Sequence, residues 1–170
     1  MRAVVERFGC EGVLRAGALQ TRVALGRGGV RADKREGDGA TPSGILPLRR
    51  ILYRADRLTA DDRGILAGAL PSVRIARCDG WCDDPDHADY NTAVTLPHGG
   101  RHECLWRADK LYDVVGVLGW NDDPVVRGQG SAIFLHLAGE QFAPTEGCLA
   151  LAKSDLLALL GAGLSEIEVV

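Results

Sequence analysis

The chain has 170 residues, of which 46% are apolar, and its formal net charge is −3. This length and composition suit one hydrophobic core, so we expect a single domain over residues 1–170. The near-neutral charge provides no broad cationic surface for nucleic acid, and no apolar run approaches the roughly 18 residues of a membrane span. Glycine supplies 22 residues, about twice its usual share of about 7%, which excludes an all-helical bundle.

Short apolar or alternating runs between Gly, Pro and Asp residues predict strands along most of the chain. In chain order these are 3–8, 18–25, 45–53, 73–76, 93–96, 113–118, 132–137 and 166–170. An α/β fold would place a helix after nearly every strand. The pattern therefore predicts a mainly β fold, a β-sandwich of short mixed strands with one or two short capping helices.

Two segments predict those helices. Residues 154–160 form the clearer one, which Ser154 would cap and which Gly161 or Gly163 would end in the left-handed conformation. Residues 59–70 predict a weaker helix, because each interior glycine costs about 1 kcal/mol of helix propensity. Pro71 would end it.

The segment Thr145-Glu-Gly-Cys148 is the first indication of chemistry. A cysteine on a glycine-containing loop is accessible, and Gly147 would let a substrate carbonyl approach the sulfur while the backbone N–H groups of Gly147 and Cys148 face its oxygen. Twelve positions upstream, His136 ends the apolar run of a predicted strand. An imidazole beside a thiol lowers the thiol pKa from about 8.5 toward neutrality. A buried structural cysteine and a core histidine are the alternative interpretation.

Several segments resemble the L,D-transpeptidase (YkuD-type) catalytic domain, over about residues 20–155. Lys34-Arg-Glu-Gly-Asp-Gly-Ala-Thr-Pro-Ser-Gly44 resembles its signature loop, Ala132-Ile-Phe-Leu-His136 its histidine strand, and Thr145-Glu-Gly-Cys148 its nucleophile loop. Asp79-Gly-Trp-Cys-Asp-Asp-Pro85 and Tyr90-Asn91 are similar to a pattern of one bacterial branch. The resemblance implies a β-sandwich, no cofactor and peptidoglycan stem peptides as substrates.

The resemblance also implies the roles of the site residues. Cys148 would attack the carbonyl at the L-centre of meso-diaminopimelate and expel D-alanine, with His136 as the base, and a second nucleophile would resolve the thioester. The predicted substrate-binding residues are Thr145, Glu146, Trp81, Asp83, Asp84, Tyr90 and Asn91. For the acidic residues near Trp81, a solvated loop that the indole anchors to the core is the alternative interpretation.

The chain departs from the family pattern at three points. Glu146 replaces the histidine that usually precedes Gly-Cys, and it would orient His136, bind a substrate amine or turn out into solvent. Ala150 stands where the family commonly has arginine, so a substrate carboxylate needs another anchor. Only twelve positions separate His136 from Cys148, so we expect the pair to meet across a hairpin with a shortened pocket rim.

The expected location of the protein in the cell bears on which reaction it catalyses. Glu6 and Arg7 interrupt the apolar run that a secretory signal would need, and five cysteines, an odd number, favour reduced thiols. We therefore expect a cytoplasmic protein, in which water at about 55 M resolves the acyl-enzyme. The expected activity is an L,D-carboxypeptidase that removes the terminal D-Ala from tetrapeptide muropeptides during cell-wall recycling. An L,D-transpeptidase that forms 3-3 crosslinks is the alternative.

A second class of function comes from the remaining cysteines and histidines. Nitrogen and sulfur donors suited to structural zinc lie at Cys78, Cys82, His87, His98, His102 and Cys104. Their spacing is loose, so the sequence assigns no metal ligand. A zinc-stabilised, non-enzymatic binding module stays the alternative from this class, and the oligomeric state is left open.

Overall fold

The computed structural model describes residues 1–68 and 70–170. Strands make up 38% of the chain, and the described part contains two short α-helices, α1 (Ala60–Ala67) and α2 (Lys153–Gly161). The predicted mainly β fold with one or two short helices is therefore confirmed. In the described residues no helix is both long enough and apolar enough to cross a membrane.

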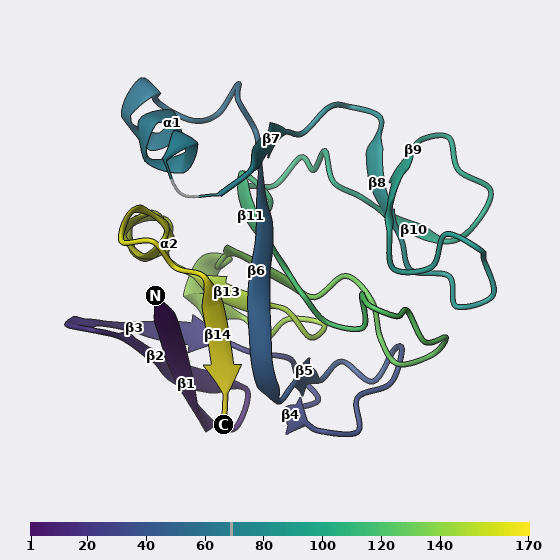
Figure 1. Cartoon of the computed structure of the whole chain (residues 1–170), viewed down its shortest axis with the longest axis horizontal. Coiled ribbons are helices and arrows are strands. Elements are labelled where there is room, and N and C mark those ends of the chain that lie inside the picture. The colour runs from purple at the N-terminus through teal and green to yellow at the C-terminus, as the bar shows by residue number, and fades with distance from the viewer. Residues whose placement is uncertain (69) are drawn as a thin grey trace.

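The main sheet closes on itself. In the described chain it contains nine strands in the order β11-β12-β13-β3-β2-β1-β14-β6-β7, and β11 also pairs with β6. Their bounds are β1 (Arg2–Phe8), β2 (Glu11–Ala16), β3 (Leu19–Ala24), β6 (Gly44–Tyr53), β7 (Ser72–Arg74), β11 (Val114–Leu118), β12 (Phe134–Leu137), β13 (Leu149–Leu151) and β14 (Glu166–Val169). The long strand β6 closes the ring because its first half pairs with β14 and its second half with β11 (Figure 1).

A smaller sheet lies on the side of the molecule away from the two helices (Figure 1). It has the order β10-β8-β9 and consists of β8 (Asp79–Cys82), β9 (Ala93–Thr95) and β10 (His102–Cys104). Trp81 of β8 packs edge-on against Phe134 of β12, with ring centroids 5.2 Å apart. The small sheet thus packs against one face of the main sheet. The remaining elements are β4 (Val30–Arg31), β5 (Thr41–Pro42) and the 3-10 turn η1 (Glu140–Phe142).

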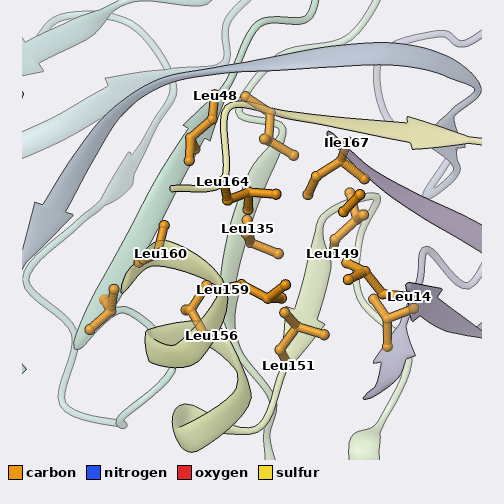
Figure 2. Close-up of a cluster of buried hydrophobic side chains, with 14 of the residues drawn as sticks. Leu14, Leu48, Leu135, Leu149, Leu151, Leu156, Leu159, Leu160, Leu164 and Ile167 are labelled. Carbon is orange, nitrogen blue, oxygen red and sulfur yellow. The ribbon is translucent and has the colours of Figure 1, made fainter. Parts of the chain in front are cut away.

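Strands β11, β12 and β13 are buried on both faces. On one face, Leu135 and Leu149 pack with the leucines of α2 (Figure 2). On the other face, Phe134 and Cys148 belong to a second apolar cluster with Trp81. Because side chains alternate along a strand, neighbouring residues enter different cores. Each buried leucine or phenylalanine contributes about 1.5–3 kcal/mol to folding.

The helices agree with the prediction except at one cap. Helix α1 begins with a capping box, in which Thr59 Oγ1 accepts from the Asp62 N–H and the Asp62 carboxylate accepts from the Thr59 N–H. Residue 69, inside the range predicted for this helix, lies outside the described residues. The predicted Ser154 cap of α2 is wrong, because the helix begins one residue earlier and Ala152 is the cap, without a side-chain hydrogen bond. Gly163 does end α2, at φ 81°.

The prediction of the strands is wrong in two respects. The prediction omits β2, β8 and β10, which contain Gly, Glu, Asp or His where a strand pattern needs apolar residues. It also omits β4 and β5, which have only two residues each. The expected hairpin between His136 and Cys148 is also absent from these described residues. Strands β12 and β13 pair in parallel, so the segment between them crosses over instead of making a tight turn.

Candidate active site

Cys148 and His136 lie on the same face of two neighbouring strands. The register of β12 and β13 pairs Leu135 with Leu149 and His136 with Ala150. Cys148 stands one residue before β13, so the alternation of side chains places it on the face of His136, opposite to Leu149. Both side chains line one pocket of about 230 Å³. The parallel pairing therefore brings the two predicted catalytic residues together.

The Cys148 sulfur is held by the backbone of the neighbouring segment. The Phe134 N–H donates to Sγ over 3.4 Å, and the thiol donates to the Ala132 carbonyl over 3.3 Å. The residue is only 8% exposed. Burial, assisted by the Glu103 carboxylate, raises the pKa of the thiol to about 12. The expectation that the imidazole lowers this pKa toward neutrality is therefore wrong, and the thiol is protonated at pH 7.

His136 is oriented by its own strand. Its Nδ1 lies 2.8 Å from the Leu137 carbonyl oxygen, so the proton sits on Nδ1 and the basic lone pair is on Nε2. The Tyr112 ring packs against the imidazole, with centroids 5.3 Å apart. Burial lowers the pKa of His136 to about 4. At pH 7 the site thus holds a neutral thiol beside a neutral imidazole that can accept a proton.

Gly147 and Thr145 shape the loop that presents Cys148. Gly147 has φ 128°, and a Cβ there would lie 2.7 Å from the Ala40 carbonyl oxygen, so this position requires glycine. Thr145 Oγ1 accepts from the Gly147 N–H over 3.1 Å and donates to the Cys148 carbonyl over 2.7 Å. Of the two predicted oxyanion donors, the Gly147 N–H is thus engaged by Thr145. The Cys148 N–H has no acceptor among the described residues.

The loop over residues 34–44 packs against the loop of residues 145–148. Thr41 is fully buried; its Oγ1 accepts from the Gly26 N–H over 2.8 Å and lies 3.5 Å from the Cys148 carbonyl oxygen. Lys34 and Asp38 form a buried ion pair over 2.7 Å within this loop. These contacts fix the turn and leave its charged groups facing one another, so the loop is structural.

A family model for the L,D-transpeptidase catalytic domain, YkuD, matches residues 13–163. The chain belongs to this family. It is therefore an L,D-transpeptidase-type peptidoglycan enzyme, and peptidoglycan stem peptides are its class of substrate. No curated protein and no solved structure matches the chain.

Three of the residues that the family resemblance placed in substrate binding are buried and bonded inside the protein. Tyr90 donates its hydroxyl proton to Glu36. Asn91 Oδ1 accepts from Trp81 Nε1 over 3.1 Å and from the Ala132 N–H over 3.0 Å. Because the Ala132 carbonyl accepts the Cys148 thiol proton, Asn91 supports the site from outside the pocket.

The four acidic or polar residues of that prediction divide into two pairs. Asp83 pairs with Arg101 over 3.0 Å, and Asp84 accepts from the Arg101 N–H over 3.2 Å. Neither carboxylate lines the pocket of Cys148. Thr145 and Glu146 do line the pocket. The Glu146 side chain is 71% exposed and pairs with Arg27. It has turned outward, and the Leu137 carbonyl, not Glu146, orients His136.

Sequence reasoning missed three residues that complete the pocket wall, namely Glu103, Arg107 and Tyr112. The Tyr112 hydroxyl donates to Glu103 over 2.9 Å, and burial raises the pKa of this carboxyl. The Arg107 guanidinium lies 5.0 Å from the centre of the Tyr112 ring. One feature of the sequence indicated that a cationic residue had to come from elsewhere in the chain. Ala150 removes the usual family arginine, and Arg107 supplies a guanidinium to the same pocket.

Proposed function

We propose that this chain is a cysteine-dependent L,D-carboxypeptidase that removes the terminal D-Ala from tetrapeptide muropeptides. The observation that carries the proposal is the shared pocket of Cys148 and His136, on one face of two parallel strands. The family supplies the substrate class and the acyl-transfer chemistry.

The protonation states support general-base catalysis. As Cys148 Sγ attacks the carbonyl of the diaminopimelate L-centre, His136 Nε2 takes the thiol proton. The Cys148 N–H would donate to the oxyanion, an interaction whose loss typically costs roughly 3 kcal/mol of transition-state stabilisation. His136 then gives the proton to the leaving D-alanine amine. In the second half, His136 takes a proton from water and the hydroxide attacks the thioester carbonyl. The C–S bond then breaks, His136 returns the proton to the departing sulfur, and the tripeptide is released.

The charges around the pocket suit the end of a tetrapeptide. Arg107 pairs with Asp109 through Nε and Nη2, over 2.9 Å and 2.6 Å. Its Nη1 would therefore donate a single charge-assisted hydrogen bond to the carboxylate of the terminal D-Ala. Glu146 lies at the rim and Glu103 in the wall. Their acidic groups suit the free amine of the diaminopimelate side chain.

Two observations support hydrolysis over crosslinking. A pocket of about 230 Å³ is below the roughly 300–1,000 Å³ of common ligand sites, so it suits one peptide end and a water molecule better than two stems. All five cysteines are free thiols, which suits a reducing compartment such as the cytoplasm. There the substrates would be soluble muropeptides returned for recycling.

The test is incubation of the purified protein with a defined tetrapeptide muropeptide in ¹⁸O-labelled water, followed by mass spectrometry. Hydrolysis predicts loss of one alanine and one heavy oxygen in the new carboxylate of the tripeptide. Dimer products in place of the tripeptide would overturn the carboxypeptidase assignment in favour of the transpeptidase.

Two variants locate the reaction. Cys148→Ala should abolish the product, and Cys10→Ala, which removes a thiol outside the pocket, should leave the rate unchanged. Full activity of Cys148→Ala would overturn the proposed site itself.

A further inference from the structure

Three potential metal ligands converge at the small sheet. Cys82, His87 and His98 each offer one ligand atom, and these atoms all lie within 4.8 Å of one another. Cys82 is the last residue of β8 and is fully buried. His87 lies in the loop between β8 and β9, and His98 in the loop between β9 and β10. Three separate chain segments thus direct nitrogen and sulfur donors to one point.

The surroundings of the two imidazoles fit metal binding. Asp89 Oδ2 lies 3.2 Å from His98 Nε2 and 3.6 Å from His87 Nδ1. The other ring nitrogen of His98, Nδ1, accepts from the Gly100 N–H over 3.2 Å and lies 3.4 Å from the Gly100 carbonyl oxygen. Histidines that bind a metal through one nitrogen usually donate the other N–H to a carbonyl or carboxylate, which fixes the ring. With a proton on Nδ1, the Gly100 carbonyl would be the acceptor that orients His98, and Asp89 is placed as a fourth ligand.

The distances are compatible with tetrahedral coordination. Bonds of about 2.0–2.1 Å to nitrogen and about 2.3 Å to sulfur place neighbouring ligand atoms roughly 3.3–3.6 Å apart. The ligand atoms lie within 4.8 Å of one another, so binding would bring them closer by at most about 1.5 Å, which side-chain rotations can provide. One thiolate, two imidazoles and a carboxylate form a closed donor set of the kind that zinc prefers over calcium or magnesium.

We propose that Cys82, His87 and His98 form a structural site for a transition-metal ion of the Zn²⁺ class. Asp89 lies outside the converging group of three, but its carboxylate is within 3.6 Å of both imidazoles and would be the fourth ligand. The other cysteines and histidines considered from the sequence do not join it. Cys78 and Cys104 are exposed free thiols, and His102 lies outside the converging group. The site is separate from the pocket of Cys148, so the proposal is independent of the proposed reaction.

The role of such an ion follows from the small sheet. Strands β8, β9 and β10 have only three or four residues each, and short strands alone give marginal stability. The ion would tie β8 to both of its following loops. The same sheet carries Trp81, which packs against Phe134, and Glu103, which lines the catalytic pocket. Metal binding would therefore hold one wall of that pocket in place.

The first test is the metal content of the full chain, purified without a histidine tag from zinc-supplemented cells and dialysed against a mild chelator. We expect near one zinc per chain in the wild type and near none in Cys82→Ser and in His98→Gln. His102→Gln is the matched control and should keep its zinc, because it removes a neighbouring imidazole outside the group. Unchanged zinc in Cys82→Ser would overturn the proposal.

A second measurement keeps all of the proposed ligands in place. Addition of Co²⁺ to metal-free wild type should produce a thiolate-to-cobalt charge-transfer band and the visible bands of tetrahedral cobalt. The double variant Cys78→Ser/Cys104→Ser, which lacks the two exposed thiols of this region but keeps Cys82, should give the same bands. A wild type that lacks zinc after purification and shows no thiolate band with Co²⁺ would also overturn the proposal.

Discussion

The Cys148 thiol and the His136 imidazole are both neutral at pH 7 because burial disfavours the charged form of each. In the proposed reaction, ionisation of the sulfur is therefore coupled to attack, when the proton moves to His136. A protonated, buried thiol is a weak nucleophile toward small reagents and oxidants. The resting site is thus protected until a peptide carbonyl enters the pocket.

This protection predicts the order in which the thiols react. With limiting iodoacetamide at pH 7, the exposed Cys78 and Cys104 should be alkylated before Cys148, because the thiol with the pKa of about 12 has almost no thiolate at that pH. Quantitative peptide mass spectrometry over time gives the order. Preferential alkylation of Cys148 would instead indicate an ionised sulfur and contradict the general-base sequence.

A second prediction concerns Arg107. If its guanidinium binds the substrate carboxylate, Arg107→Gln should lower kcat/KM by about 10- to 150-fold, since a charge-assisted hydrogen bond contributes about 1.5–3 kcal/mol. The loss should appear mainly in KM. A tetrapeptide amide, which lacks that carboxylate, should show little difference between wild type and variant. Arg49→Gln is the control, because Arg49 pairs with Asp122 on the surface.

Sequence reasoning found the two central side chains and missed the pocket wall for one physical reason. Cys148 and His136 stand in local patterns, a glycine loop and an apolar strand. Glu103, Arg107 and Tyr112 come from β10 and the loop before β11, and only the packing of the small sheet on the main sheet brings them to the sulfur. The thiol pKa was misjudged because burial depends on the same packing.

Helix ends show the same division between local and distant causes. Gly163 was predicted correctly because the left-handed residue and its bonds are local. The Gly163 N–H donates to the Leu160 carbonyl, and the Leu164 N–H donates to the Leu159 carbonyl, each over about 3 Å. The start of α2 was mispredicted because the chain enters the helix directly from β13, before Ser154.

The two glycines in and after the helices predict opposite effects on stability. Gly163→Ala should destabilise the protein by about 1 kcal/mol, because φ is 81° there and alanine resists the left-handed region. Gly64→Ala should stabilise it by up to about 1 kcal/mol, because Gly64 lies inside α1 with no atom near the added Cβ. Urea unfolding of both variants is the measurement. Equal effects of the two changes would contradict the assigned backbone conformations.

The sequence did not predict how the strands that carry His136 and Cys148 are connected. A gap of twelve positions fits either a hairpin loop or a crossover, and the sequence offers no rule to choose between them. The choice depends on β3, which pairs with β13 from a distant part of the chain. The sequence therefore predicted that Cys148 and His136 would be near each other, but with the wrong connection.

At the scale of the whole molecule, two apolar clusters cover opposite faces of β11, β12 and β13. Burial in this core affects both the protonation of the site and the stability of the fold. The same burial that keeps His136 neutral makes its protonation unfavourable to folding. Its pKa is about 4 in the folded protein and near 6.5 in the unfolded chain. The unfolded chain thus binds the extra proton as the pH falls from 6.5 to 4, and folding stability decreases over that interval.

This linkage predicts a measurable difference between wild type and His136→Gln. Between pH 7 and pH 5, the titration of His136 should lower the free energy of unfolding by about 2 kcal/mol. The glutamine variant, which cannot titrate, should lose about that much less over the same interval. Urea unfolding at both pH values gives the comparison. Parallel losses in the two proteins would show that His136 is protonated equally in the folded and unfolded states.

The contact of Gly147 with the Ala40 carbonyl joins two loops backbone to backbone. The group that a side chain at position 147 would meet is backbone, so no second substitution can make room for it. Directed evolution of this enzyme should therefore retain glycine at position 147. New substrate preferences should arise across the pocket, among the side chains of residues 103–112, where replacements can compensate one another.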